Sequence, residues 1–193
     1  LPVITNDEPG TIQRFEWGLV PSWAEDRSDF EFINARAETV AEKRTFAEAY
    51  ERRRCLVPAD GFYEWGDTGD GRRPYRIEVG DRDPFAMAGL WTRWEPTHRQ
   101  TGLGEFSGET GDADPIHTFT ILTTDANETL APIHDRMPVV LSRDEESAWL
   151  IEDTDGLRSL LDPYEGDMRS YAVSSQVNNP RNDTQSVIEP AER

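Results

Sequence analysis

Short stretches in which apolar or aromatic residues alternate with polar ones recur along the chain, and a period of two is typical of β-strands. Turn formers such as Asn6–Gly10 separate these stretches. The pattern predicts one hairpin of Leu1–Thr5 with Thr11–Val20, and another of Tyr75–Val79 with Phe85–Trp91 across residues 80–83. Further strands are expected at Gly61–Trp65, Ile116–Thr124, Pro138–Leu141 and Arg169–Val173.

Helices are expected at few places. Most follow a Ser, Thr or Asp with a Glu three residues later, which is the pattern of a capping box. The pairs are Thr39 with Glu42, Thr45 with Glu48, Asp125 with Glu128, and Ser142 with Glu145. They predict helices at Phe46–Arg53, from 125 to about Pro132 and from 142 to about Ile151, with a short one near Leu157–Leu161. Many strands with few helices predict an α+β fold with a mainly antiparallel sheet.

A chain of 193 residues is long enough for one core, so we expect a single domain over residues 1–193. The polar, glycine-rich stretch at 95–115 is interpreted as an insertion loop. No apolar run is long enough to span a bilayer, and the lone cysteine, Cys55, favours a reducing compartment. We therefore expect a cytoplasmic monomer without membrane contact.

The charge is strongly acidic: 38 Asp and Glu against 20 Lys and Arg give a net charge of −18. Lys43 is the single lysine, and such a composition resembles that of proteins from salt-accumulating halophiles. An acidic chain normally argues against nucleic-acid binding. A local basic patch changes this expectation, because arginines flank the aromatic motifs described next: Arg36, Arg52, Arg53, Arg54, Arg72 and Arg73. The run 52–54 is equally well explained by capping of the preceding helix.

Gly61–Trp65 carries the first candidate for chemistry. Strand side chains alternate, so Glu64 shares a face with Phe62, among large apolar groups. Partial burial raises a carboxyl pKa and suits it to proton transfer near neutral pH. The alternative is an exposed glutamate on an edge strand. For His134 the alternatives are proton transfer and a structural role.

Three other features have two interpretations each. If residues 34–36 are extended, Asn34 and Arg36 share a face, where Arg36 can hold a phosphate; otherwise they are a turn former and a surface ion pair. Trp17 and Trp23 flank a Gly/Pro turn and either stack on bases or bury a core edge, and we expect at least one of them in the core. Cys55 lies in an apolar run and is expected to be buried and inert. The scattered histidines have no zinc-ligand spacing, so no metal or cofactor is expected.

Five blocks in this order resemble the SOS response-associated peptidase family, the abasic-site shield proteins: W-G-L-V-P-S-W, N-A-R-A-E-T, C-L-V-P-A-D-G-F-Y-E-W, F-T-I-L-T-T and I-H-D-R-M-P. The resemblance runs from Leu1 to about Asp183. It implies a curved, barrel-like sheet flanked by helices and single-stranded DNA with abasic sites as partner. It places the catalytic residues at Asn34, Glu64 and His134, and DNA-binding residues at Trp17, Trp23, Arg36 and Arg136.

The family's nucleophile is a cysteine that becomes residue one after removal of methionine, and no such cysteine occurs among these residues. Because the chain begins inside an expected strand, we interpret its start as lying after the family's N-terminal segment. The resemblance implies an enzyme that exposes this cysteine by autoproteolysis and crosslinks it to abasic sites as a thiazolidine. The alternatives are a cysteine-dependent peptidase acting on proteins and a non-catalytic module that binds single-stranded DNA.

Overall fold

The computed structural model describes residues 1–69, 71–80, 84–95 and 114–191. Most of the expected insertion at 95–115, namely residues 96–113, lies outside the described residues. None of the helices within the described ranges has the length and apolar character needed to cross a membrane.

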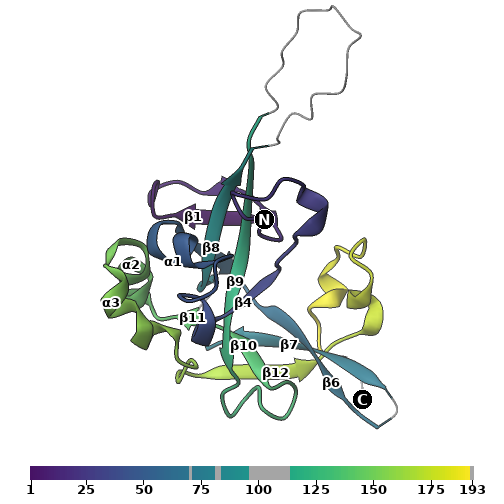
Figure 1. The fold of residues 1–193 in the computed structure, drawn as a ribbon. Coiled ribbons are helices and arrows are strands. Elements are labelled where there is room, and N and C mark those ends of the chain that lie inside the picture. The colour runs from purple at the N-terminus through teal and green to yellow at the C-terminus, as the bar shows by residue number, and fades with distance from the viewer. Residues whose placement is uncertain (70, 81–83, 96–113, 192–193) are drawn as a thin grey trace, which may run out of the picture.

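The largest element is a nine-stranded, mainly antiparallel sheet with β8 and β9 at its centre (Figure 1). Its path runs β10-β9-β8-β5-β1-β2, while β11 pairs with β8, and β3 and β4 pair in parallel with β9. The strands are β1 (Pro2–Thr5), β2 (Gln13–Arg14), β3 (Glu16–Trp17), β4 (Asn34–Arg36), β5 (Arg54–Ala59), β8 (Phe85–Trp94), β9 (Ile116–Asp125), β10 (Arg136–Pro138) and β11 (Val140–Leu141). The expected α+β class and antiparallel sheet are confirmed, and the sheet is open.

A second sheet of three strands lies beside the first, in the order β12 (Met168–Ala172), β7 (Arg72–Val79) and β6 (Phe62–Asp67). The predicted hairpin of 75–79 with 85–91 is therefore wrong, because β7 pairs with β6 and β12 whereas β8 pairs with β5 and β9. Burial explains the separation. Nine of the ten residues of β8 are buried, which suits a strand covered on both faces.

Helices are short: α1 (Ala47–Arg52), α2 (Arg143–Ile151), α3 (Thr154–Leu157), and the 3-10 turns η1 (Arg27–Asp29), η2 (Ala37–Thr39), η3 (Arg158–Leu161), η4 (Ser175–Asn178) and η5 (Gln185–Val187). The capping box of α2 is confirmed, since the Ser142 N–H donates to Glu145 Oε2 at 2.7 Å. The box predicted at Thr45 is wrong, because α1 begins after Phe46 without a side-chain cap. Thr39 ends η2 instead of capping a helix.

The helix predicted after Asp125 is also wrong, because residues 128–133 form turns. Asp125 does not cap a helix, because its carboxylate accepts from Arg136. Asn127 takes over the local role: its Oδ1 accepts from the backbone N–H groups of Thr129 and Leu130 at 3.1 Å each. This asparagine turn replaces the helix and ends at His134, whose N–H donates to the Leu130 carbonyl.

The core is divided by the large sheet. Leu56, Leu90 and Leu122 belong to the cluster that packs against α1 and α2. Residues of the opposite face, such as Val57, Met87 and Ile121, belong to the cluster that reaches the second sheet. Figure 1 shows α1–α3 on one side of β8 and β9, and β6 with the C-terminal segment on the other. The second side holds a cavity.

Candidate active site

A cavity of about 690 Å³ opens where β4 and β6 approach the second face of the large sheet. Most of its lining is apolar or aromatic. The polar side chains of the lining include those of Asn34, Asp60, Glu64 and Thr123. The aromatic and apolar lining residues are Trp17, Ile33, Val57, Phe62, Tyr63, Trp65, Met87, Ile121 and Pro138, among others. A largely apolar pocket with a few polar groups is typical of a small-molecule or catalytic site.

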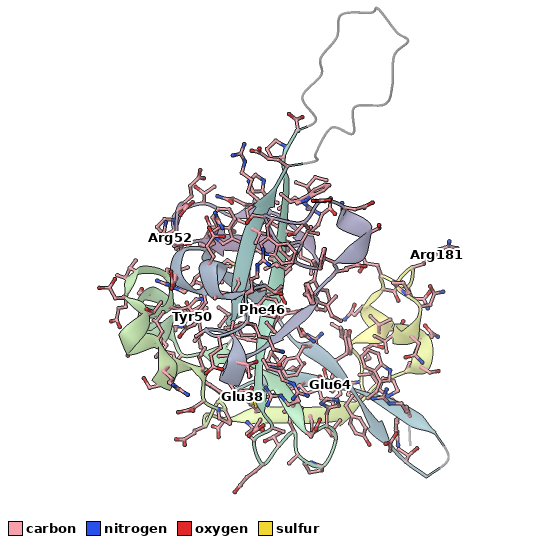
Figure 2. The ribbon with its side chains drawn as sticks, viewed as in Figure 1. Glu38, Phe46, Tyr50, Arg52, Glu64 and Arg181 are labelled. Atoms are coloured by element: carbon pink, nitrogen blue, oxygen red, sulfur yellow. The ribbon has the colours of Figure 1, made fainter. Side chains whose placement is uncertain are left out.

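Glu64 lies in the middle of β6, opposite Tyr75 of β7, near the place where β6 passes the large sheet (Figure 2). The expected strand is confirmed, and the carboxyl group is half-buried in the cavity wall. Burial raises the pKa of Glu64 above its usual range, and the neighbouring His134 and Arg72 reverse part of that rise. A carboxyl group with a raised pKa keeps its proton to higher pH than an ordinary glutamate, which suits a general acid.

His134 follows the asparagine turn and is partly exposed. Its Nδ1 accepts from the Arg136 backbone N–H at 3.0 Å, so a neutral ring carries its proton on Nε2. The Arg136 carbonyl and the Asp135 carboxylate lie 3.2 and 3.4 Å from the same Nδ1. These oxygens can accept from a protonated Nδ1, so the same surroundings serve both protonation states. The charge of His134 lowers the pKa of Glu64, so the ring lies near the carboxyl group, although His134 is not among the residues that line the cavity.

Asn34 and Arg36 lie on β4, which is extended as predicted. Ala35 between them is buried, so Asn34 and Arg36 point to the opposite, exposed side. Asn34 pairs with Ile121 of β9 and lines the cavity, so it belongs to a strand and not to a turn. Arg36, two residues after Asn34 on β4, pairs with Thr123 of β9 and is exposed beside the cavity.

Arg136 is the best-connected side chain near the site. Its two terminal nitrogens donate to both oxygens of Glu38, to Asp125 Oδ1 at 2.7 Å and to the Thr123 carbonyl at 2.6 Å. Only 15% of the side chain is exposed. The guanidinium group therefore ties η2, β9 and β10 together next to the cavity. The sequence pattern indicated Asp125 only as a helix cap and did not indicate Glu38, so neither was predicted as a partner of Arg136.

Trp17 and Trp23 lie at different places on the surface. Both are exposed, 44% for Trp17 and 43% for Trp23, so the expectation that at least one lies in the core is wrong. Trp17 lines the cavity, and its Nε1–H donates to the Ile33 carbonyl at 2.8 Å. Trp23 is not among the residues that line the cavity; the Arg44 guanidinium lies 4.8 Å from its ring centre and Phe30 meets it edge-on. The Gly/Pro turn between them directs the two rings to different parts of the surface.

The expected arginine patch is likewise divided. Arg54 is buried and donates to the carbonyls of Tyr50, Trp149 and Glu152, so it closes the ends of α1 and α2. Arg53 pairs with Glu48. Arg52 lies on the α1 side of the molecule, well away from Glu64 (Figure 2). Arg36 and Arg72 remain near the cavity, and the capping explanation holds for Arg54.

Cys55 is fully buried on β5, and burial raises the pKa of its thiol, as expected of an inert cysteine. Sequence reasoning missed Trp65, which lines the cavity beside Glu64. Its position in the same aromatic strand was the available signal. Among the described residues, no group of three or more His, Cys, Asp or Glu is arranged to hold a metal ion.

The fold and the site define a class: an α+β protein in which a half-buried carboxyl group and an amide line an apolar cavity, with an imidazole near the carboxyl group. The chain belongs to the SOS response associated peptidase (SRAP) family, whose model matches residues 1–180.

Two relatives and one solved structure show how far the likeness extends. The chain is 40% identical to abasic site processing protein YoqW of Bacillus subtilis, over 98% of this chain and 81% of that protein. It is 33% identical to abasic site processing protein HMCES of Gallus gallus, over 94% of this chain and 58% of that protein. A crystal structure of a Bacteroides thetaiotaomicron protein superposes with a TM-score of 0.84 at 32% identity, covering 99% of this chain and 81% of that one.

Proposed function

We propose that the protein processes abasic sites in DNA, binding them in single strands and capturing them covalently. The observation that carries the proposal is the meeting of Glu64 and Asn34 in one cavity, with His134 acting electrostatically on Glu64. The names of the relatives, abasic site processing proteins, agree with this function. Family membership supports it over most of the chain.

The cavity suits a sugar that has lost its base. An abasic deoxyribose carries no base, so the sugar alone has to fit between the apolar walls of the cavity. The exposed indole of Trp17 offers a face on which a neighbouring base can stack. Arg36, exposed one step beyond Asn34, can pair with a phosphate. Unpaired bases are free to stack on an aromatic side chain, which favours a single strand over a duplex.

The other residues that we propose for DNA binding lie outside the cavity lining. Arg136 places positive charge near the bound DNA strand. Glu38 and Asp125 already form ion pairs with its guanidinium group, so a DNA phosphate has to share that group with them. Trp23 and Arg44 form a separate aromatic and cationic contact outside the cavity. Net charge opposes DNA binding, so stacking and covalent capture have to supply most of the affinity.

The covalent step belongs to an N-terminal cysteine of the family type, exposed by autoproteolysis. The α-amine has a pKa near 7.7–8.0, so a useful fraction is neutral and attacks the C1′ aldehyde of the open sugar. Water leaves to give an imine, and the thiol of the same cysteine adds to the imine carbon to close a thiazolidine. Cys55 cannot replace it, because it is buried and its amine is part of a peptide bond.

Glu64 and His134 move the protons in this scheme. A protonated Glu64 donates to the ring oxygen of the sugar as it opens, and to the leaving water during imine formation. His134, with oxygens and an N–H around Nδ1, takes up and returns protons in the same steps or in reversal. Asn34, fixed on β4, orients the reacting amine.

A denaturing gel tests the proposal. The protein carrying an N-terminal cysteine is incubated with a single-stranded oligonucleotide that contains one abasic site. A slow-migrating adduct is expected, and it should disappear when that cysteine is changed to alanine or the aldehyde is first reduced. A Cys55→Ala variant should form as much adduct as the unchanged protein. No adduct at any protein concentration, or an adduct that needs Cys55, would refute the proposal.

A further inference from the structure

The C-terminal segment, residues 174–191, lies against the second sheet, and we call it the C-terminal clasp. Figure 1 shows it, in yellow, beside β6 and β7. It is joined at its far end by the Ala191 N–H, which donates to the Ala172 carbonyl at 2.8 Å, and by the bridge of Val173 with Pro190. The hydroxyl group of Tyr171 donates to the Ile188 carbonyl at 2.9 Å. The clasp is therefore a defined part of the fold.

The contact nearest the site is made by Asn178. Its Oδ1 accepts from Nε1–H of Trp65 at 2.8 Å. Trp65 follows Glu64 on β6 and lines the same cavity. The Trp65 carbonyl accepts from Arg72 at 3.1 Å, so backbone and indole are each held by a separate partner.

Asn178 is itself held in place. It is the last residue of η4, where the Ser174 hydroxyl accepts from the Gln176 N–H. The Asn179 N–H donates to the Gln176 carbonyl at 3.1 Å and closes this turn directly after Asn178. An acceptor fixed in this way selects one orientation of the indole ring.

We propose that Asn178 is a positioning residue for DNA binding: it fixes the Trp65 indole at the cavity wall so that the ring contacts the damaged strand next to the abasic sugar. This inference rests on the proposed function. It gives the C-terminal clasp, which supplies no reacting group, a part in binding the DNA. A base stacks on the face of an indole ring, and a freely rotating ring loses part of this contribution to binding. Loss of one hydrogen bond corresponds to a change of about two- to tenfold in affinity.

The test is a double-mutant cycle on Asn178→Ala and Trp65→Phe, which removes the acceptor and the donor of one hydrogen bond while an aromatic ring remains. The probe is a labelled single-stranded oligonucleotide with one tetrahydrofuran abasic analogue, which binds without covalent capture. Affinity is measured by fluorescence anisotropy at one fixed salt concentration. Asn182→Ala is the matched control, because it removes an asparagine hydrogen bond inside the clasp that does not reach Trp65. Thermal unfolding of each variant reports on the fold.

Each single variant should weaken binding by about two- to tenfold, and the double variant should be no weaker than the weaker single one. Asn182→Ala should bind like the unchanged protein. In the DNA-free protein, the indole N–H resonance of Trp65 should move in Asn178→Ala and stay in Asn182→Ala. Unchanged affinity in Asn178→Ala, equal losses in both asparagine variants, or additive losses in the cycle would overturn the inference. If the unchanged protein binds no abasic strand, the proposed function fails, and the positioning role for binding fails with it even where the indole resonance moves.

Discussion

Arg136 and Glu38 meet in a two-point ion pair, with Nη1 at 2.5 Å from Oε1 and Nη2 at 3.0 Å from Oε2. The two residues are 98 positions apart in the sequence, and their pair fastens β10 to the turn that follows β4. Arg136 lowers the pKa of Glu38 by hydrogen bonding and by charge, against an opposing effect of burial. The pair thus stabilises the strand that carries Asn34 and Arg36.

The first prediction concerns this pair and pH. A carboxyl group with a lowered pKa in the folded state stabilises the fold above its unfolded pKa, and this contribution is lost as pH falls through the folded value. Glu38→Gln should therefore lower the melting temperature at neutral pH, by an amount equivalent to about 1 kcal/mol because Glu38 is partly exposed. The difference from the unchanged protein should shrink as pH falls below the usual glutamate range. Glu51→Gln, an exposed glutamate on α1, is the control. A difference that does not depend on pH would contradict the assignment.

The second prediction concerns Glu64 and stability. Its pKa is raised, so the folded state bears a cost of burying the charge that grows as pH rises from the unfolded pKa through the folded pKa. Below both values the group is neutral in either state and the cost vanishes. Glu64→Gln should therefore raise the melting temperature at pH 7–8 and leave it nearly unchanged near pH 4. Thermal unfolding at a series of pH values measures this, and a destabilised variant at pH 8 would count against burial as the main cause.

The third prediction concerns Cys55. The thiol is fully buried, and a Cβ on Gly89 of the neighbouring strand would lie only 2.9 Å from its Sγ. A thiol reagent should react slowly with the native protein and at once after unfolding in denaturant. Reaction is followed by absorbance, with the denatured protein as the reference. Rapid labelling of native protein would show that this part of the sheet is open to solvent.

The fourth prediction concerns salt. A net charge of −18 destabilises a compact chain through self-repulsion, and molar salt reduces the Debye length to about 3 Å. Thermal unfolding should therefore shift to higher temperature between dilute buffer and molar KCl. Glucose of matched concentration is a control for effects unrelated to charge. Greatest stability in dilute buffer would contradict the interpretation of the composition.

The sequence predicted those features that depend on local pattern. The aromatic pattern at 61–65 predicted the strand β6, on which Glu64 lies in the cavity wall, and the apolar run at Cys55 indicated burial. The capping box at Ser142 was correct because α2 is amphipathic and needs no distant partner at its start. The resemblance to the family supplied the roles that are proposed for Asn34, Arg36 and His134.

The errors have a common physical cause, which is a distant partner that overrides a local signal. Asp125 has the spacing of a helix cap, but Arg136 takes its carboxylate. The stretch at 80–83 has turn formers, but β7 and β8 find better partners in different sheets. Trp23 has apolar neighbours in sequence, yet Arg44 meets its ring at the surface. Trp65 is a candidate because it lines the cavity and donates a hydrogen bond to Asn178 of the clasp, and both contacts depend on distant parts of the chain.

The central claim is that Glu64 performs proton transfer on an abasic site held in the described cavity. The most direct measurement is the time course of adduct formation between an abasic single-stranded oligonucleotide and the protein carrying an N-terminal cysteine, compared with Glu64→Gln and the control Glu51→Gln. Glu64→Gln should be slower by about 10²–10⁴-fold, while its affinity for the tetrahydrofuran strand stays within about twofold. Glu51→Gln should match the unchanged protein. Equal rates for Glu64→Gln and the unchanged protein would contradict the account.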